Sequence, residues 1–169
     1  MALERIYAGW RRRYVEQASQ GVTADGAGCI FCELEGAPIG AASGVVAREE
    51  HAFGVLNAFP YGSGHVLVLP RRHAAAIADL DEAESIGLWR LSVRSLRAIE
   101  LAYRPDGANL GANLGVAGGA GIPGHLHLHV LPRWGGDTNF MTAVAETRVV
   151  NEDLAVTFEK LHAAFERLS

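Results

Sequence analysis

The segment His125-Leu126-His127-Leu128-His129-Val130-Leu131 is the stretch on which the fold and its chemistry depend. Successive side chains of a β-strand point to opposite faces, so the three histidines are expected on one face and the intervening apolar residues against the core. Three histidines in register are improbable in an ordinary strand. An incidental polar face or a tag-like metal binder is the alternative, but the internal position after a glycine-rich loop favours a functional row.

A row of imidazoles next to that loop indicates chemistry at phosphate. Imidazole is largely unprotonated at neutral pH and can attack a phosphate to form a covalent intermediate. Neighbouring histidines can fix its tautomer and donate to phosphate oxygens or to the leaving group. The loop from Gly115 to Gly121 lacks a Cβ at four of its seven positions, so its amides could approach a phosphate closely. A mobile surface loop would have the same composition.

Composition narrows the class of protein. The chain has 169 residues, 49% hydrophobic and 20% charged, which predicts one globular domain and excludes extensive disorder. It has no apolar run long enough for a transmembrane helix and no apolar signal core near its start, so a cytoplasmic location is expected. The net charge of −4 argues against a general nucleic-acid binder, whereas small phosphates remain compatible.

Hydrophobic periodicity predicts an α+β domain with an antiparallel sheet. The helix at 80–103 is expected to begin at Asp79, with Glu82 completing a capping box, and Asn151 is expected to cap a last helix. The inward stripe of the long helix is predicted to be Ile86, Trp89, Val93, Leu96, Ile99 and Tyr103. In the last helix the inward residues are predicted to be Leu154, Phe158, Leu161, Phe165 and Leu168. The remaining expected elements are a helix at 3–19 and strands at 45–47, 52–57, 65–69, 109–114, 125–131 and 144–150.

The motifs resemble those of the histidine triad (HIT) family, whose signature alternates three histidines with apolar residues. Residues 125–131 match that signature, and 64–70 match the upstream strand motif G-H-x-L-V-x-P. Three further stretches are similar to the bacterial branch labelled diadenosine tetraphosphate (Ap4A) phosphorylases or hydrolases. They are residues 132–141, Leu114-Gly115 and the N-terminal Trp10-Arg11. The resemblance covers about residues 29–140, between an N-terminal helix and loop (1–28) and a C-terminal strand and helix (141–169) of a single domain over 1–169.

The resemblance implies a fold and a set of roles. The fold is a five-stranded antiparallel sheet with flanking helices, usually a homodimer that continues the sheet. His127 would be the nucleophile, His129 would assist at the α-phosphate or leaving group, and His65 would orient the row. The substrate-binding positions would be Asn57 at the ribose and Asn113, Gly115 and Gly121 at phosphate. Some relatives carry a serine just before the triad, where this chain has only residues 121–124, Gly-Ile-Pro-Gly.

The two cysteines form one C-x-x-C, Cys29 and Cys32, which excludes a disulfide framework and leaves metal, redox or no chemistry. A thioredoxin-like motif would need a βαβ context, which is not predicted here. Zinc-containing members of the resembled family use two further histidines. On that analogy Cys29, Cys32, His73 and His125 would bind a structural Zn²⁺, with all four positions filled by protein.

Other charged residues carry weaker signals. His51 and His162 are expected at the surface or the core margin, and residues 11–13 form a short basic helix face. Arg71, Arg72 and Arg133 border the expected site, where they either attract polyphosphate or are ordinary surface arginines.

The expected function is a nucleotidyl transferase or hydrolase that cleaves Ap4A-like dinucleotides through an adenylyl-histidine. Phosphate or water would be the acceptor. The alternatives are a nucleoside phosphoramidate hydrolase, a nucleotide-binding regulatory module with little activity, and a zinc-binding interaction domain. Retention of His127 and His129 beside His125 favours the enzyme, because a pure metal binder needs neither.

Overall fold

The computed structural model describes residues 26–137 and 152–168. Its strands form one five-stranded antiparallel sheet in the order β1-β2-β3-β5-β4, which confirms the predicted fold class. The strands are β1 (Val45–Arg48), β2 (Ala52–Leu56), β3 (Val66–Pro70), β4 (Gly107–Ala112) and β5 (Leu128–Arg133). The helices in the described residues are α2 (Ile30–Gly36), the 3₁₀ turn η1 (Ile77–Asp79), α3 (Glu82–Tyr103) and α5 (Leu154–Glu166).

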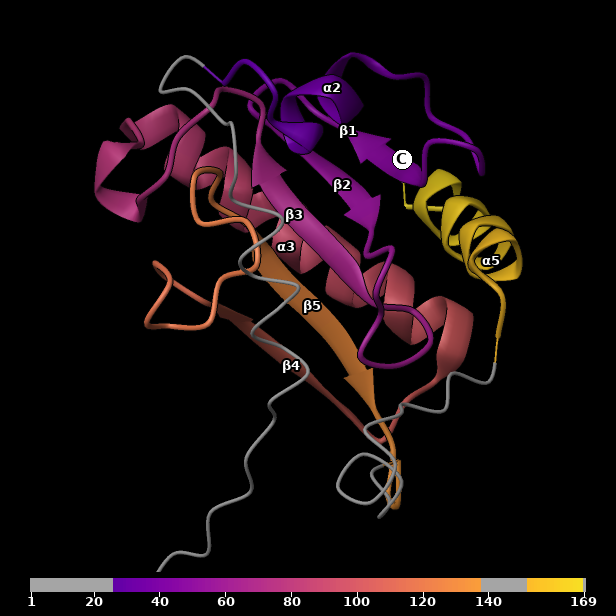
Figure 1. The fold of residues 1–169 in the computed structure, drawn as a ribbon. Helices are drawn as coiled ribbons and strands as arrows, with labels where there is room; N and C mark the ends of the chain where they lie inside the picture. The colour runs from indigo at the N-terminus through magenta and orange to yellow at the C-terminus, as the bar shows by residue number, and fades with distance from the viewer. Residues whose placement is uncertain (1–25, 138–151, 169) are drawn as a thin grey trace, which may run out of the picture.

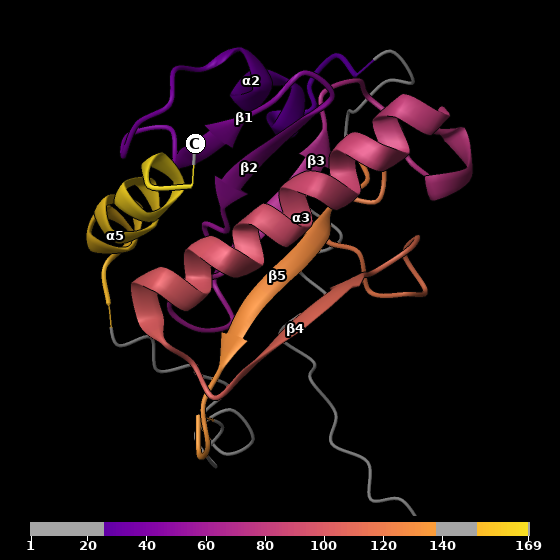
Figure 2. The same ribbon diagram turned by 180° about the vertical axis from the view of Figure 1, so that it is seen from behind.

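The sheet is covered on both faces at its centre, because every residue of β2 and β3 is buried. Val66 and Val68 face a core cluster shared with α3 and α5, and both helices lie across that face in Figure 2. Leu67 and Leu69 point the other way, into a second cluster that contains Cys29 and Phe31 at the start of α2. The helix α2 lies near β1 and β2 (Figure 1). The histidine face of the sheet is therefore the face that carries α2.

The long helix α3 begins two residues later than the sequence suggested. Asp81 accepts a hydrogen bond from the amide of Glu84 at 2.8 Å, and the Glu84 carboxylate accepts from the amide of Asp81 at 3.0 Å. This reciprocal pair is a capping box of the kind expected for Asp79 and Glu82, formed two residues later in the chain. Asp79 instead accepts a hydrogen bond from the amide of Ala76 and closes the 3₁₀ turn η1.

The predicted inward stripe of α3 is wrong in its first half. Ile86 and Trp89 are 43% and 58% exposed. The buried face includes Ser92 and Ser95, whose hydroxyls donate to the carbonyls of Leu88 and Leu91 at 2.8 Å. These short hydroxyl side chains are satisfied within the helix and allow it to lie close to the sheet, so a search for large apolar residues misses them. The buried residues of this helix are Glu84, Leu88, Leu91, Ser92, Ser95, Ala98 and Ile99.

The strand ends also differ from the prediction. Pro70 pairs with Ala52 at the end of the β2–β3 ladder and is the last residue of β3, one residue beyond the expected end. Pro132 pairs with Ala108 inside the β4–β5 ladder, so this proline does not end its strand. The ladder of β5 begins at Leu128 rather than His125. The edge strand β4 spans 107–112 rather than 109–114.

The last helix follows its prediction more closely. Phe158, Leu161 and Phe165 are buried, whereas Leu154 is 39% exposed and the N-cap is Asp153 rather than Asn151. The expected helix at 3–19 and the expected strand at 144–150 lie outside the described residues. Within 26–137 and 152–168, no helix has the length and hydropathy needed to cross a bilayer.

Candidate active site and metal centre

The histidines of the motif gather on one face, as the alternation predicted. The ring centroids of His127 and His129 are 5.1 Å apart, and those of His129 and His65 are also 5.1 Å apart. His129 lies in β5, whereas His125 and His127 lie just before it, where the amide of Leu126 donates to the carbonyl of Ala74 at 2.7 Å. That bond joins the segment before β5 to the residues after β3, so His125 and His127 continue the row of histidines on the same face as His129.

His127 has a defined tautomer. Its Nδ1 lies 2.8 Å from the carbonyl oxygen of His125, and a carbonyl can only accept, so Nδ1 carries the proton. The lone pair of the neutral ring is then on Nε2. His127 is 7% exposed, and burial lowers its pKa from the usual value, so the ring is neutral at pH 7. A neutral imidazole with its lone pair on Nε2 is the form required of a nucleophile.

The ring of Phe31 packs against two of these histidines. Its centroid is 5.3 Å from that of His127 and 5.6 Å from that of His125. Phe31 is 6% exposed and lies between the two cysteines of the C-x-x-C. It excludes water from His127 and so contributes to the burial that lowers the pKa of this ring.

A chain of hydrogen bonds fixes the proton on His129. The backbone amide of Tyr61 donates to Nδ1 of His65 at 3.1 Å, so the proton of neutral His65 is on Nε2. That Nε2 lies 3.0 Å from Nδ1 of His129 and donates to it. The proton of neutral His129 is therefore on Nε2, where it is available as a donor. The Tyr61 ring also stacks on His129, with centroids 5.5 Å apart and an angle of 17° between the ring planes.

The two predicted asparagines lie beside these histidines. The Nδ2 atom of Asn57 is 3.4 Å from Nδ1 of His65, and its Oδ1 accepts from the amide of Phe59 at 3.0 Å. The side-chain amide of Asn113 is 3.4 Å from Nε2 of His129. Because that Nε2 carries a proton, the amide oxygen of Asn113 is the group that should face it, which corresponds to a flip of the amide.

The glycine-rich loop has the backbone shape that only glycine tolerates well. Gly115 has a φ of +67°, and a Cβ on Gly118 would lie 2.3 Å from the carbonyl oxygen of Leu114. Gly121 is half-buried, four residues before His125. The roles of Gly115 and Gly121 toward a phosphate stay predictions.

The four predicted metal ligands converge. The ligand atoms of Cys29, Cys32, His73 and His125 all lie within 4.8 Å of one another. The sulfur–nitrogen distances are 3.5 Å from Cys29 and 3.6 Å from Cys32 to Nδ1 of His125, and 3.3 Å from Cys32 to Nδ1 of His73. Zinc bond lengths of about 2.3 Å to sulfur and about 2.0 Å to nitrogen place neighbouring tetrahedral ligands roughly 3.5 Å apart. The donor set and its spacing therefore fit Zn²⁺.

His125 is oriented as a metal ligand. Its Nε2 lies 3.1 Å from the carbonyl oxygen of Pro70, so Nε2 carries the proton and Nδ1 presents its lone pair to the sulfurs. Burial lowers the pKa of His125 to about 4, so the ring is neutral at pH 7. Burial, together with Cys29 and then Glu35 and Glu33, raises the pKa of Cys32 to about 11, so metal binding would displace a proton from this thiol.

Sequence reasoning missed Gly26, which closes the metal centre from the N-terminal side. Its carbonyl accepts from the amide of Cys29 at 3.0 Å, and its φ is +88°. A Cβ at this position would lie 2.9 Å from the sulfur of Cys32 and 3.0 Å from Cγ of His73. Phe31, Tyr61 and Glu35 were also not predicted, because their roles depend on contacts between distant segments.

The three arginines near the site are engaged with carboxylates. Arg72 pairs with Glu84 at 2.7 Å, and Arg71 pairs with Glu35 at 2.6 Å. Arg133 pairs with Asp137 at 2.6 Å. Attraction of polyphosphate by these arginines stays a prediction. His51 lies 3.7 Å from Glu50, and His162 stacks on Phe158, which agrees with marginal positions for both.

Comparison with known proteins adds independent evidence. A family model described as HIT domain matches residues 40–136. A Mycobacterium tuberculosis protein named AP-4-A phosphorylase is 40% identical over 123 residues, which cover 73% of this chain and 63% of that relative. The chain thus spans just under two thirds of that protein's length.

Solved structures show the same fold. The crystal structure of a zinc-bound histidine triad family protein from Mycobacterium smegmatis has a TM-score of 0.68 at 28% identity, over 84% of this chain and 96% of that chain. A hypothetical histidine triad nucleotide-binding protein from Sulfolobus tokodaii has a TM-score of 0.66 at 26% identity, over 83% and 93% of the two chains.

Proposed function

Because the chain belongs to the histidine triad (HIT) family, we propose that it is a nucleotidyl transferase that cleaves Ap4A-like dinucleoside polyphosphates. The observation that carries this proposal is the hydrogen bond from Nδ1 of His127 to the carbonyl of His125. It leaves the lone pair of a neutral, buried ring on Nε2. The similarity to a protein named AP-4-A phosphorylase supports the choice of substrate class.

In the first half of the reaction, Nε2 of His127 attacks the α-phosphorus of one adenylyl group. A nitrogen–phosphorus bond forms, the bond from that phosphorus to the bridging oxygen breaks, and ATP leaves with the electron pair of the bond. The product on the protein is an adenylyl-histidine. His129, whose Nε2 carries a proton, donates to an oxygen of the phosphate as negative charge moves onto the leaving group.

In the second half, an acceptor attacks the same phosphorus and the nitrogen–phosphorus bond breaks. Inorganic phosphate yields ADP, and water yields AMP. The electron pair returns to Nε2 of His127, and Nδ1 keeps its proton throughout because its partner is a carbonyl. The same adenylyl-histidine would react with either acceptor.

We assign substrate contacts to the predicted asparagines and glycines. Asn57 uses one amide proton and one oxygen lone pair within its loop, which leaves its second proton and second lone pair available for ribose hydroxyls. Asn113 lies beside Nε2 of His129, where an α-phosphate oxygen would also bind. The amides around Gly115 and Gly121 would bind the remaining phosphates, in place of the missing serine hydroxyl.

We also propose a structural zinc ion held by Cys29, Cys32, His73 and His125. Bound there, the ion would supply a cross-link rather than a Lewis acid for the substrate, because all four ligands come from protein. His125 links that cross-link to the reaction, since its carbonyl accepts the Nδ1 proton of His127. The two thiols in the ligand set favour a reducing compartment such as the cytoplasm.

A homodimer is part of the proposal. The edge strand β4 is mostly exposed, and its outer backbone groups are suited to pairing with a second copy of the chain. On α3, Ile86 and Trp89 are exposed apolar residues that an interface would cover. A Trp89→Arg variant that remains dimeric in sedimentation analysis would argue against an interface at this face.

A nucleoside phosphoramidate is the second candidate substrate. Its leaving group is an amine, which needs a proton as it departs. The hydrogen bonds from Tyr61 to His65 and from His65 to His129 leave the proton of neutral His129 on Nε2, so the same site is suited to that reaction. A regulatory module that binds nucleotides without turnover is disfavoured because it has no need of a neutral nucleophile.

Product analysis by anion-exchange chromatography tests the function. The protein is incubated with Ap4A, with and without inorganic phosphate, beside a His127→Ala variant. ATP plus ADP formed only with phosphate indicates a phosphorylase, and ATP plus AMP without phosphate indicates a hydrolase. No turnover of Ap4A, or equal turnover by the variant, would reject the proposal, and turnover of an AMP–amine substrate would then support the second candidate.

A further inference from the structure

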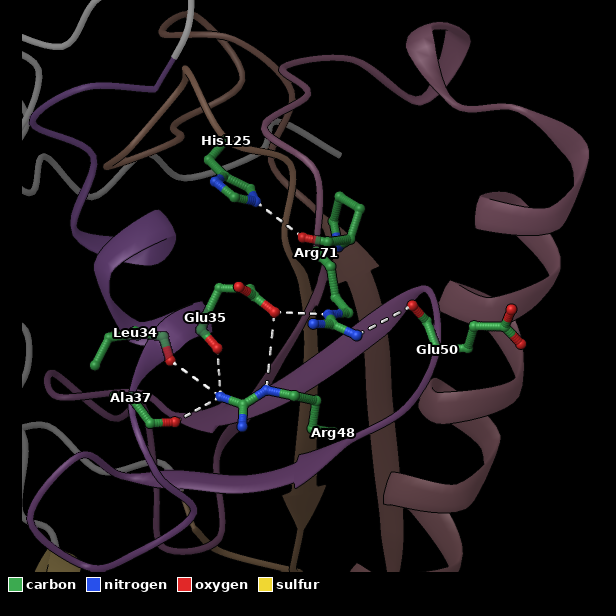
Figure 3. A network of polar contacts seen from close by, with 8 residues as sticks. Leu34, Glu35, Ala37, Arg48, Glu50, Arg71 and His125 are labelled. Carbon is green, nitrogen blue, oxygen red and sulfur yellow. Dashed lines mark hydrogen bonds and ion pairs between the residues drawn. The ribbon is translucent and has the colours of Figure 1, made fainter.

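Three separate segments carry the ligands of the proposed metal centre. Cys29 and Cys32 lie at the start of α2, His73 follows the end of β3, and His125 lies just before β5. The helix α2 is only seven residues long. A helix this short has little stability of its own, so its position depends on contacts with the rest of the fold. The polar contacts in Figure 3 hold the end of α2 that lies away from the cysteines.

Arg48 in β1 binds the C-terminal end of α2. Its Nη2 atom donates to the carbonyl oxygens of Glu35 at 2.5 Å, Ala37 at 2.6 Å and Leu34 at 3.4 Å (Figure 3). The last carbonyls of a helix have no partners within it, and a guanidinium also interacts favourably with that end of the helix dipole. Arg48 therefore fixes the end of α2 on the sheet.

Glu35 joins that helix to the segment that bears His73. Its Oε1 accepts from Nε of Arg71 at 2.6 Å and lies 3.9 Å from Nε of Arg48. Glu35 is three residues after Cys32, and Arg71 is two residues before His73. A single carboxylate thus links the strand β1, the cysteine-bearing helix and the histidine-bearing segment.

Arg71 is itself held in place on the sheet. Its amide donates to the carbonyl of His51 at 3.0 Å, and its Nη1 donates to the carbonyl of Glu50 at 3.4 Å. The carbonyl oxygen of the preceding residue, Pro70, accepts the Nε2 proton of His125 at 3.1 Å. The Glu35–Arg71 ion pair therefore joins two of the three segments that the metal would cross-link.

We propose that Glu35 is a positioning residue of the metal centre, which holds α2 against the residues after β3 so that the cysteine sulfurs stay at ligand distance from His73 and His125. This inference rests on the proposed zinc ion. For the ion to leave, the sulfurs of α2 must separate from the histidines, and the ion pair with Arg71 opposes that movement. Residues that orient metal ligands without touching the metal commonly affect how tightly it is held.

The expected effect is moderate, because Arg71 is 42% exposed and Glu35 is 23% exposed in their side chains. Loss of a partly exposed ion pair corresponds to a change of about two- to fivefold in an equilibrium or rate. Salt screens such a pair, so the wild-type protein should release zinc faster as ionic strength rises. A variant without the pair should show a weaker dependence on salt.

The experiment measures the rate at which zinc-loaded protein transfers its metal to an excess of a colorimetric chelator. Glu35→Gln is compared with Glu33→Gln, a matched control that removes the same charge from the same helix. Both carboxylates contribute to the raised pKa of Cys32, but only Glu35 bridges to the segment that carries His73. Glu35→Gln is expected to release zinc about two- to fivefold faster than the control.

A double-mutant cycle with Arg71→Gln separates positioning from general loss of stability. If the pair acts as one unit, the double variant releases zinc no faster than either single variant, and Arg71→Lys, which keeps the charge, restores part of the slow release. Melting temperatures of the metal-free variants are recorded alongside. Equal release by Glu35→Gln and Glu33→Gln, or additive effects in the cycle, would overturn the inference. Wild-type protein that takes up no zinc would refute the proposed metal itself, and this inference with it.

Discussion

The Nδ1 atom of His127 lies 2.8 Å from the carbonyl oxygen of His125, whose own Nδ1 faces the sulfurs of Cys29 and Cys32. One residue, His125, therefore connects the Cys29–Cys32–His73–His125 cluster to the ring that we propose as the nucleophile. Its side chain belongs to that cluster, and its backbone carbonyl sets the tautomer of His127. This relationship generates predictions about pH, metal and packing that can be measured separately.

The metal-free protein should lose stability as the pH falls from about 6.5, the ordinary pKa of histidine, toward 4. Burial lowers the pKa of His125 to about 4 and also lowers that of His127. In this window the unfolded chain binds more protons than the folded chain, so protonation favours unfolding, and the stability present above pH 6.5 is lost. His125 alone would account for roughly 3 kcal/mol, at about 1.4 kcal/mol per pKa unit.

Urea unfolding of the metal-free protein at several pH values measures this effect. His125→Asn should flatten the dependence relative to the wild-type protein. A wild-type stability that does not change between pH 6.5 and pH 4 would show that neither buried ring resists protonation.

Loss of the proposed zinc should weaken the fold more than the chemistry. Cys32→Ser removes one of four ligands. When the free zinc concentration is one hundred times the dissociation constant, binding adds about 2.7 kcal/mol to the free energy of unfolding, which corresponds to roughly 5–10 °C in melting temperature. Zinc content by atomic absorption, melting temperature and turnover are measured on the same samples. His127→Ala is expected to keep its zinc and lose turnover. A Cys32→Ser protein that is folded but wholly inactive would contradict a structural role for the ion.

Gly26→Ala should damage the metal centre from outside the ligand set. The new Cβ would lie 2.9 Å from the sulfur of Cys32, on a backbone with a φ of +88°. Gly36→Ala is the matched control, because a Cβ there meets nothing within 4 Å. Zinc affinity should fall in the first variant and stay at the wild-type value in the second. Equal affinities would mean that the loop before Cys29 moves aside without cost.

Phe31→Leu should raise the pKa of His127 toward its ordinary value. The Phe31 ring covers His127 with centroids 5.3 Å apart, and a smaller side chain admits water that stabilises the charged imidazole. The shift is read from the pH titration of the histidine ring signals by NMR. Phe158→Leu, which removes the ring stacked on His162, is the control and should leave the His127 titration unchanged. An unchanged pKa in Phe31→Leu would assign the burial of His127 to other residues.

The histidine face could be predicted from sequence because it depends on local alternation in one segment. The C-x-x-C and His73 were placed at one site only through resemblance to a family, since residues 29 and 125 are far apart in the chain. The position of Asn57 beside His65 likewise followed from the family motif. These predictions agree with where the side chains lie.

What the sequence did not reveal depends on long-range packing. Residues 79–84 are compatible with two capping boxes, Asp79–Glu82 and Asp81–Glu84. The ion pair between Glu84 and Arg72 favours the second box, and no local sequence pattern encodes that ion pair. Trp89 was expected in the core, but the helix packs through Ser92 and Ser95 instead. The link between Glu35 and Arg71 joins residues 36 positions apart and has no motif.

The central claim is that His127 accepts the nucleotidyl group on Nε2. The most direct test is rapid mixing of the protein with Ap4A without phosphate, an alkaline denaturing quench at successive times, and intact-mass spectrometry. The wild-type protein should gain the mass of one adenylyl group at early times, and His127→Ala should gain none. Turnover with no adduct at any quench time, or an equal adduct on His127→Ala, would contradict the claim.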